Sequence, residues 1–244
     1  MPSVVEEKLV EIEKIDTVES SEISAEPHKL RFFQKVYVFF KALADFFIAF
    51  VALTVLLPVF LIVAIAIKID SKGPVFFVQK RVGKGGKEFK CIKFRSMSTD
   101  ANHNIAGYEY SDVKSYITKV GKFIRKTSID ELPQLINILT FKMSLIGYRP
   151  SQSNEYELNN ARESYDMYQI RPGISGWAQV NGRDVLAAKP KEKAKFDAYY
   201  LEHVSLWLDI KILFMTVIQV FKHDGVSEGV ISEKKDESAE VHAE

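Results

Sequence analysis

Cysteine is nearly absent from this chain of 244 residues, which contains only Cys91. This scarcity excludes several kinds of site. A single thiol cannot form an intramolecular disulfide or a cysteine-based zinc site, and it fits a reducing compartment. We interpret Cys91 as a small buried residue. The first thirty residues also lack the charged, apolar and small-residue pattern of a cleavable signal peptide.

Net charge is almost absent from the chain, but the charges are unevenly distributed along it. The sequence has 33 Lys and Arg against 32 Asp and Glu, for a formal charge of +1. Residues 1–27 hold eight acidic residues and two lysines. This leader and the acid-rich tail, residues 224–244, lack a sustained apolar period, so both are expected to be disordered. The length predicts one main domain, which we place at residues 73–223, after a juxtamembrane and membrane segment at 28–72.

The longest uncharged stretch runs for twenty-two residues, from Phe46 to Ile67. A helix needs about 20 apolar residues to cross a bilayer core, so this run is long enough to span a membrane. Pro58 lies near its middle and lacks a backbone donor, which predicts a kink or break. From the residues alone a slightly bent spanning helix is favoured, and a re-entrant hairpin and a buried soluble helix are the alternatives. Basic residues at both ends favour two cytoplasmic ends.

Two β-forming stretches around a glycine-rich centre predict a hairpin within residues 73–97, with its turn at Gly83 to Lys87. A Walker A phosphate loop is not favoured, because the required glycine spacing and the Ser or Thr after the lysine are missing. The strand period of two places Lys93 and Arg95 on one face. These two side chains could therefore bind one anion together.

The adjacent carboxylates Asp130 and Glu131 precede an apolar run that begins at Leu132. Ser128 and Glu131 have the spacing of a capping box, which would make the pair a structural cap. In that case Pro133 would fall in the second turn of the helix, at a cost of about 3 kcal/mol. Proline is tolerated at the first helical position, so we expect the helix to begin near Pro133, with both carboxylates in the turn before it.

The surroundings of this acidic pair predict phosphate chemistry. The positive end of the following helix and the nearby Arg125 are expected to keep Asp130 ionised. An ionised aspartate can act as a nucleophile or a metal ligand without a neighbouring base. Mg²⁺ takes one or two carboxylates together with substrate phosphates, so Asp130 and Glu131 are candidate Mg²⁺ ligands at a phosphoryl-transfer site.

Two loops punctuated by glycine and proline, residues 143–150 and 171–183, carry further candidates. Arginine presents a planar fork of donors that matches phosphate, and Asn or Gln can bind a base or a sugar hydroxyl. The candidates in these loops are Arg149, Arg171, Gln179 and Arg183.

Residues 195–221 have apolar and aromatic side chains at helical spacing. Two interpretations remain open for this segment. It is either an ordinary core helix or an amphipathic helix in the membrane interface, and Trp207 with its basic and apolar neighbours fits the second.

Several of these motifs, in their order and spacing, resemble the bacterial sugar transferase family, polyprenyl-phosphate hexose-1-phosphate transferases also called monotopic phosphoglycosyl transferases. The resemblance covers about Phe46 to Phe221 and rests on the hairpin sequence and on the motifs KFRSM, TSIDELPQLINIL, MSLIGYRP and RPGISGWAQVNGR. It implies an α+β fold, with a compact cytoplasmic domain containing a β-hairpin and helices. An N-terminal re-entrant membrane helix, broken at Pro58, and interfacial amphipathic helices would anchor this domain.

The activity that the resemblance implies is transfer of a sugar-1-phosphate from a UDP-sugar to undecaprenyl (polyprenyl) phosphate, the first step in building a surface glycan. Asp130 would attack the β-phosphorus, form a covalent phosphosugar intermediate and release UMP, with Glu131 as its Mg²⁺-associated partner. The substrate-binding residues would be Lys93, Arg95, Arg125, Arg149, Arg171, Gln179 and Arg183.

The expected partners are the UDP-sugar, polyprenyl phosphate, membrane lipid and downstream glycosyltransferases, with no nucleic acid. The expected location is the bacterial inner (cytoplasmic) membrane, with the catalytic domain, residues 73–223, facing the cytoplasm. A catalytically silent membrane scaffold and a metal-dependent phosphodiesterase acting on nucleotide sugars are the alternatives. The chain departs from the family pattern at Leu57, Phe141 and Tyr148, where Ser, Gly and Pro are usual.

Overall fold

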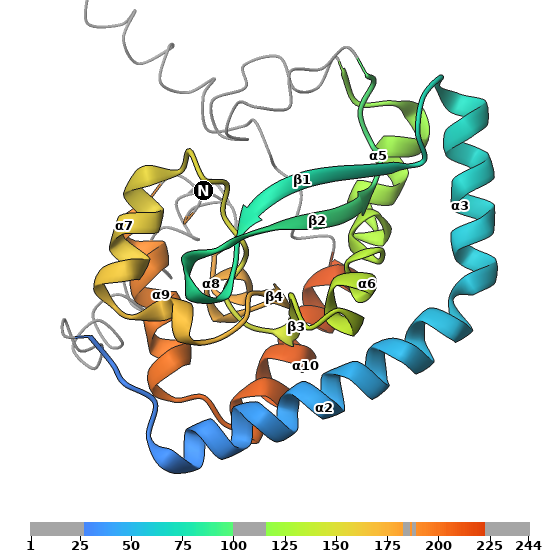
Figure 1. Cartoon of the computed structure of the whole chain (residues 1–244). Helices are drawn as coiled ribbons and strands as arrows, with labels where there is room; N and C mark the ends of the chain where they lie inside the picture. Colours follow the sequence, from blue (N-terminus) through green and yellow to red (C-terminus); the bar gives the residue numbers. More distant parts are fainter. Residues whose placement is uncertain (1–26, 100–115, 183–185, 187–188, 223–244) are drawn as a thin grey trace, which may run out of the picture.

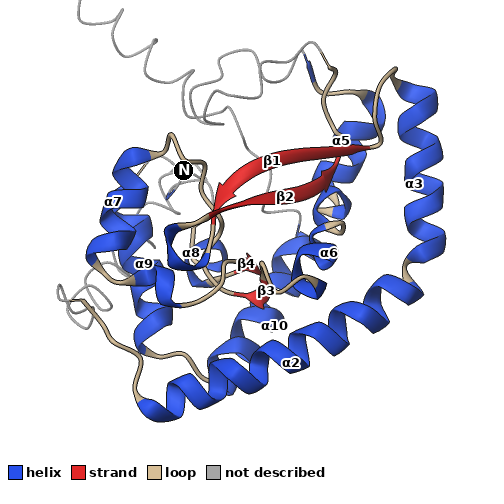
Figure 2. Ribbon diagram, viewed as in Figure 1, coloured by secondary structure: helices blue, strands red, loops and turns tan. Residues whose placement is uncertain are grey.

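The computed structural model describes residues 27–99, 116–182, 186 and 189–222. These residues form helices around two small sheets, which confirms the predicted mixture of helix and strand (Figures 1 and 2). The principal elements are α2 (Phe32–Val55), α3 (Leu57–Asp70), β1 (Phe76–Val82), β2 (Glu88–Phe94), α5 (Lys119–Lys126), η3 (Ile129–Glu131), α6 (Gln134–Leu139), β3 (Ser144–Ile146), α7 (Tyr156–Ser164), η4 (Met167–Gln169), β4 (Gly173–Ser175), α8 (Trp177–Val180), α9 (Pro190–Glu202) and α10 (Leu206–Lys222).

The long apolar run is divided between two helices. Leu56, with φ −85° and ψ 0°, separates the end of α2 from the start of α3. Pro58 lies in the first turn of α3, where a helix has no internal partner for the missing N–H. Figure 1 shows α2 and α3 leaving this joint in different directions. Residues 46–67 therefore do not form one continuous helix, and whether the two helices span or re-enter the membrane stays a prediction.

Helix α2 has the length and composition of a membrane anchor. Among the described helices it alone is long and apolar enough to cross a membrane, with 24 residues and a mean hydropathy of 2.1 in its most apolar window. Most of its surface is uncovered, since 11% of that window is buried. A core helix of a soluble protein would be mostly buried, so the exposed surface favours anchoring.

The predicted hairpin is confirmed. β1 and β2 pair antiparallel, with Phe77 opposite Lys93, and the connection between them falls at the expected glycine-rich turn. Gly85 and Gly86 adopt φ values of 70° and 69°, which glycine tolerates without the steric cost of a side chain. Cys91, a residue of β2, is buried, as predicted.

Asn137 fixes α6 against β2. Its Nδ2 donates to the Lys90 carbonyl at 2.7 Å, and its Oδ1 accepts from the Ile92 N–H at 3.0 Å. Both ends of one side-chain amide therefore bind the backbone of the strand that carries Lys93. This contact sets the position of the turn before α6 relative to β2.

A buried ion pair joins α7 to α9. Arg162 donates from Nε and Nη2 to Oδ2 of Asp197, at 2.9 and 2.6 Å. The Arg162 guanidinium also lies 4.9 Å from the ring centroid of Tyr148, which is 1% exposed. Tyr148, one of the departures from the family pattern, is therefore a core residue, adjacent to Arg149 in the sequence.

The segment at 195–221 forms two helices, so its prediction as one helix is wrong. α9 ends at Glu202, and α10 begins at Leu206 after Ser205, whose Oγ accepts from the Leu208 N–H at 3.4 Å. α9 is largely buried, whereas α10 buries a narrow stripe and exposes large apolar side chains. Trp207 is 77% exposed. The core-helix interpretation therefore describes α9, while a place for α10 in the membrane interface stays a prediction.

Buried charges connect α2 and α10 to the parallel pair β3 and β4. Lys41 of α2 lies 2.9 Å from Oδ2 of Asp209 in α10 and 3.3 Å from Asp45. Ser144, the first residue of β3, donates to Asp45, and Tyr200 donates to Asp209. This network holds the apolar helices to the strand that leads into the loop of Arg149.

Candidate active site

The acidic pair lies in the 3₁₀ turn η3, between α5 and α6. Ser128 before it has a left-handed backbone, with φ 55°, and its side chain caps no helix. The capping box is therefore not formed. Pro133 directly precedes α6, so both carboxylates lie in the turn before the helix, as the proline predicts.

Two cations from separate parts of the chain hold the Glu131 carboxylate. Lys93 Nζ donates to Oε1 at 3.0 Å, and Arg149 Nη2 donates to the same oxygen at 2.8 Å. A weaker contact of 3.4 Å joins Arg149 Nη1 to Oε2. The Glu131 charge raises the pKa of Arg149 further above its usual range. Glu131 thus orients Lys93 of β2 and Arg149 of the β3–α7 loop around the turn.

Asp130 is the partly buried member of the pair that takes no hydrogen bond from a described residue. Burial raises the pKa of its carboxyl, and the Glu131 charge raises it further. Lys93, Arg125 and Arg149 act in the opposite direction without outweighing burial. Burial therefore opposes the expected ionisation of Asp130, while the three cations favour it.

Arg125 belongs to the same electrostatic group. It lies in the last turn of α5, and burial lowers its pKa while the charges of Asp130 and Glu131 raise it. The structure therefore brings Lys93, Arg125 and Arg149 to the acidic pair from three elements. Among the described residues, three cations meet two carboxylates at this turn, an arrangement that suits an anionic ligand.

The acidic pair fits Mg²⁺ when a ligand supplies further oxygens. The described residues contain no group of three or more His, Cys, Asp or Glu side chains placed to hold a metal. Glu131 is already bound by two cations, and the partly buried Asp130 lies beside it. Mg²⁺ usually takes one or two carboxylates plus substrate phosphates and waters, a donor set that this site could complete with a bound diphosphate.

The structure does not place Arg95 beside Lys93. The Arg95 guanidinium donates to the Lys72 carbonyl, and its Nη2 donates to the Ser71 carbonyl and Oγ at 2.7 and 2.9 Å. These bonds hold the connection between α3 and β1. Arg95 is 4% exposed and acts as a structural brace, so the expected shared anion site with Lys93 is not formed.

The remaining candidates lie apart from the acidic pair or outside the described residues. Gln179 is buried and donates from Nε2 to the Ile174 carbonyl at 2.8 Å. Arg171 lies over the Phe141 ring, and no described contact joins it to Asp130 or Glu131. Arg183 lies outside the residues that the structure describes.

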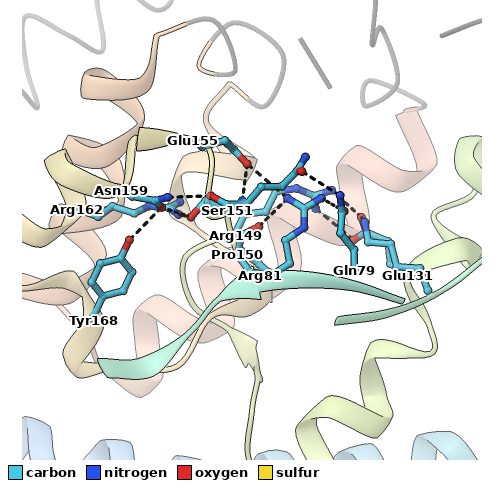
Figure 3. Close-up of polar contacts among 12 residues, drawn as sticks. Gln79, Arg81, Glu131, Arg149, Pro150, Ser151, Glu155, Asn159, Arg162 and Tyr168 are labelled. Atoms are coloured by element: carbon cyan, nitrogen blue, oxygen red, sulfur yellow. Dashed lines mark hydrogen bonds and ion pairs between the residues drawn. The ribbon is translucent and has the colours of Figure 1, made fainter. Parts of the chain in front are cut away.

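Sequence reasoning missed Arg81, which supports the loop that carries Arg149. Arg81 donates to the Pro150 carbonyl at 3.3 Å and pairs with Glu155 at 3.5 Å (Figure 3). Figure 3 shows these residues extending from Glu131 toward Ser151 and α7. The strand period of two could have identified Arg81, because it places this residue on the same face of the hairpin as Lys93.

Sequence comparisons identify the known proteins that this chain resembles. The sequence model described as "Bacterial sugar transferase" matches residues 36–223. The UDP-N-acetylgalactosamine-undecaprenyl-phosphate N-acetylgalactosaminephosphotransferase of Aeromonas hydrophila is 43% identical over 185 residues, which cover 75% of this chain and 44% of that protein. The UDP-glucose:undecaprenyl-phosphate glucose-1-phosphate transferase of Xanthomonas campestris pv. campestris is 39% identical over 189 residues, covering 75% and 39%.

The chain spans less than half the length of these two relatives. A shorter relative, the uncharacterized sugar transferase EpsL of Bacillus subtilis (strain 168), is 40% identical over 169 residues, which cover 69% of this chain and 80% of that protein. The family match includes the hairpin, the acidic turn, the Arg149 loop and α10. The chain therefore belongs to the bacterial sugar transferase family.

Proposed function

We propose that the chain transfers a sugar-1-phosphate from a UDP-sugar to a polyprenyl phosphate through a covalent intermediate on Asp130. The observation that carries this proposal is the difference between two adjacent carboxylates. Glu131 is held by Lys93 and Arg149, whereas Asp130 is partly buried beside the same cations and takes no hydrogen bond from a described residue. This arrangement leaves Asp130 able to attack a bound phosphate.

The reaction proceeds in two displacements at one phosphorus. An oxygen of the ionised Asp130 carboxylate attacks the β-phosphorus, and the bond from that phosphorus to the bridging oxygen breaks. UMP leaves with the bridging oxygen, and the sugar phosphate remains on Asp130 as a mixed anhydride. An oxygen of polyprenyl phosphate then attacks the same phosphorus, the bond to Asp130 breaks, and the free carboxylate is restored.

The cations around the pair favour this sequence of steps. Lys93, Arg125 and Arg149 favour the ionised form of Asp130 and would neutralise the oxygens of the diphosphate. When bound to Asp130 or Glu131, Mg²⁺ would supply further charge neutralisation to the phosphate oxygens. Glu131 orients two of the cations, so its contribution is positional as well as electrostatic.

The apolar surfaces support attachment to a bilayer. Large apolar side chains are exposed on α2, α3 and α10, and contiguous surfaces of this kind mark interaction with membranes or proteins. We infer that α2 and α3 enter and leave the membrane on one side through the joint at Leu56 and Pro58, with α10 in the interface. The catalytic domain would then face the cytoplasm at the bacterial inner membrane, near the acceptor phosphate.

Release of UMP by the detergent-solubilised chain tests the proposal. The donors should include UDP-glucose and UDP-N-acetylgalactosamine, each with Mg²⁺ and with or without undecaprenyl phosphate. We expect sustained release with at least one donor only when the lipid is present, because the acceptor must clear Asp130 for each turnover. Sustained release without lipid would instead establish a nucleotide-sugar hydrolase, and no release with a full donor panel would favour a scaffold.

A further inference from the structure

Arg171 is a partly buried cation that the acidic site does not use. It lies just before β4, and burial lowers the pKa of its guanidinium while the charge of Asp45 opposes this effect. The guanidinium forms no hydrogen bond or ion pair with any residue that the structure describes. A partly desolvated guanidinium without such a partner is unfavourable, so its position calls for an anionic ligand.

The Arg171 guanidinium lies on an aromatic platform beside α2. Its Cζ is 5.7 Å from the Phe141 ring centroid, and the Phe141 ring stacks on Phe46 of α2 at 5.5 Å with an interplanar angle of 6°. Phe141 keeps this place with φ 57°, a left-handed conformation that is unfavourable for a non-glycine residue. We name Arg171, Phe141 and Phe46 the Arg171 platform.

The charges around the Arg171 platform leave Arg171 without compensation. Asp45, the carboxylate that acts on its pKa, is already paired with Lys41 and accepts a hydrogen bond from Ser144. Lys142, next to Phe141, is a further exposed basic residue. The local excess charge is therefore positive and matches a phosphate, for which arginine has suitable fork geometry.

The apolar surface next to the Arg171 platform indicates the source of that phosphate. Phe141 is 48% exposed, and Phe47 and Phe50 on α2 are 64% and 56% exposed. A ligand here would meet aromatic and aliphatic groups on one side and a guanidinium on the other. This combination is the chemistry of a lipid phosphate at the boundary between acyl chains and water.

We propose that the Arg171 platform binds the phosphate of a membrane lipid at a site separate from the acidic pair. The α6 helix, about 9 Å long by its six residues, lies between the Asp130 turn and Phe141. No described hydrogen bond or ion pair joins the Arg171 side chain to Asp130 or Glu131, so a lipid bound here would position the domain on the bilayer. The inference rests on the membrane attachment in the proposed function. A phospholipid and polyprenyl phosphate share the required chemistry.

Protection of Arg171 from the arginine reagent phenylglyoxal tests this site in the full chain. The protein is kept in maltoside micelles, and peptide mass spectrometry gives the modification rate of each arginine. The additives are phosphatidylglycerol, polyprenyl phosphate, diacylglycerol and inorganic phosphate. Diacylglycerol is the matched control for the acyl chains without phosphate, and Arg81 reports general changes in reagent access.

We expect phosphatidylglycerol, polyprenyl phosphate or both to slow modification of Arg171 about tenfold when the lipid is present at about ten times its dissociation constant, because only the unoccupied protein reacts. Which of the two protects identifies the source. Diacylglycerol and inorganic phosphate should leave the rate unchanged. Equal slowing by diacylglycerol, slowing by inorganic phosphate alone, or no slowing by either lipid phosphate would overturn the site.

The Phe141→Gly variant removes the aromatic ring of the Arg171 platform without disturbing the backbone, because glycine adopts φ 57° without strain. We expect this variant to fold and to lose most of the lipid protection at Arg171, whereas full protection would overturn the role of the ring. UMP release by the wild-type chain is measured in the same micelles. Its failure would count against the proposed transferase, while failed protection of Arg171 would count against the lipid site alone.

Discussion

The substitution Asp197→Asn should destabilise the fold severely, because it removes one partner of a completely buried ion pair. The side chains of Arg162 and Asp197 are 0% and 2% exposed. Asparagine keeps the shape but leaves the Arg162 charge uncompensated, a loss that typically costs about 3–5 kcal/mol. At about 2–4 °C per kcal/mol for a domain of this size, the melting temperature should fall by about 6–20 °C. Thermal unfolding in detergent micelles measures this shift.

The same two helices offer a matched control. Glu157 of α7 and Lys191 of α9 form an ion pair of 4.0 Å with side chains that are 59% and 78% exposed. Glu157→Gln should cost less than about 1 kcal/mol, because water and salt screen an exposed pair. Replacing Arg162 by Met and Asp197 by Leu together should recover most of the lost stability. Equal falls in melting temperature for Asp197→Asn and Glu157→Gln would show that burial of the Arg162–Asp197 pair does not set the cost of breaking it.

Three further outcomes follow from the site and its supports. Burial lowers the pKa of Lys193 to about 8, so the unfolded chain holds this proton more strongly and Lys193 penalises folding below pH 8. Lys193→Met should therefore raise the melting temperature at pH 7 and lose this advantage by about pH 10, and an equal gain at both values would contradict it. Asn137→Leu should lower stability by about 2–4 kcal/mol in thermal unfolding, because it leaves a donor and an acceptor of β2 unpaired. Arg149→Lys keeps the charge but loses the fork that meets Glu131, and UMP release should fall about ten- to hundredfold. Unchanged release would show that the fork is not needed.

Local sequence signals predicted the elements that depend on neighbouring residues. The glycine-rich turn specified the β1–β2 hairpin, and Pro133 placed the acidic pair before α6, because both signals act within a few residues. Pro58 likewise indicated the helix break. The division of α9 from α10 was missed, because the apolar period continues through the short connection at Ser205 while tertiary packing turns the chain.

Long-range contacts account for what the sequence could not predict. Arg95 follows Lys93 at strand spacing, yet its guanidinium binds the backbone beyond α3. The raised pKa of Asp130 depends on burial, which no local pattern reports. Arg171 has the side-chain type of a phosphate-binding residue, but the fold places it beside Phe141, which stacks on α2. Residue type suggested the chemistry of these groups, and only packing assigned their partners.

The covalent intermediate on Asp130 is the central claim, and intact-protein mass spectrometry tests it most directly. The wild-type chain and Asp130→Asn are incubated with Mg²⁺ and an accepted UDP-sugar without lipid, then acid-quenched and mapped by peptide fragmentation. We expect a mass increase of one sugar phosphate on Asp130, lost on addition of undecaprenyl phosphate and absent from Asp130→Asn. Lipid-dependent turnover by Asp130→Asn at the wild-type rate, or an adduct on another residue, would contradict it.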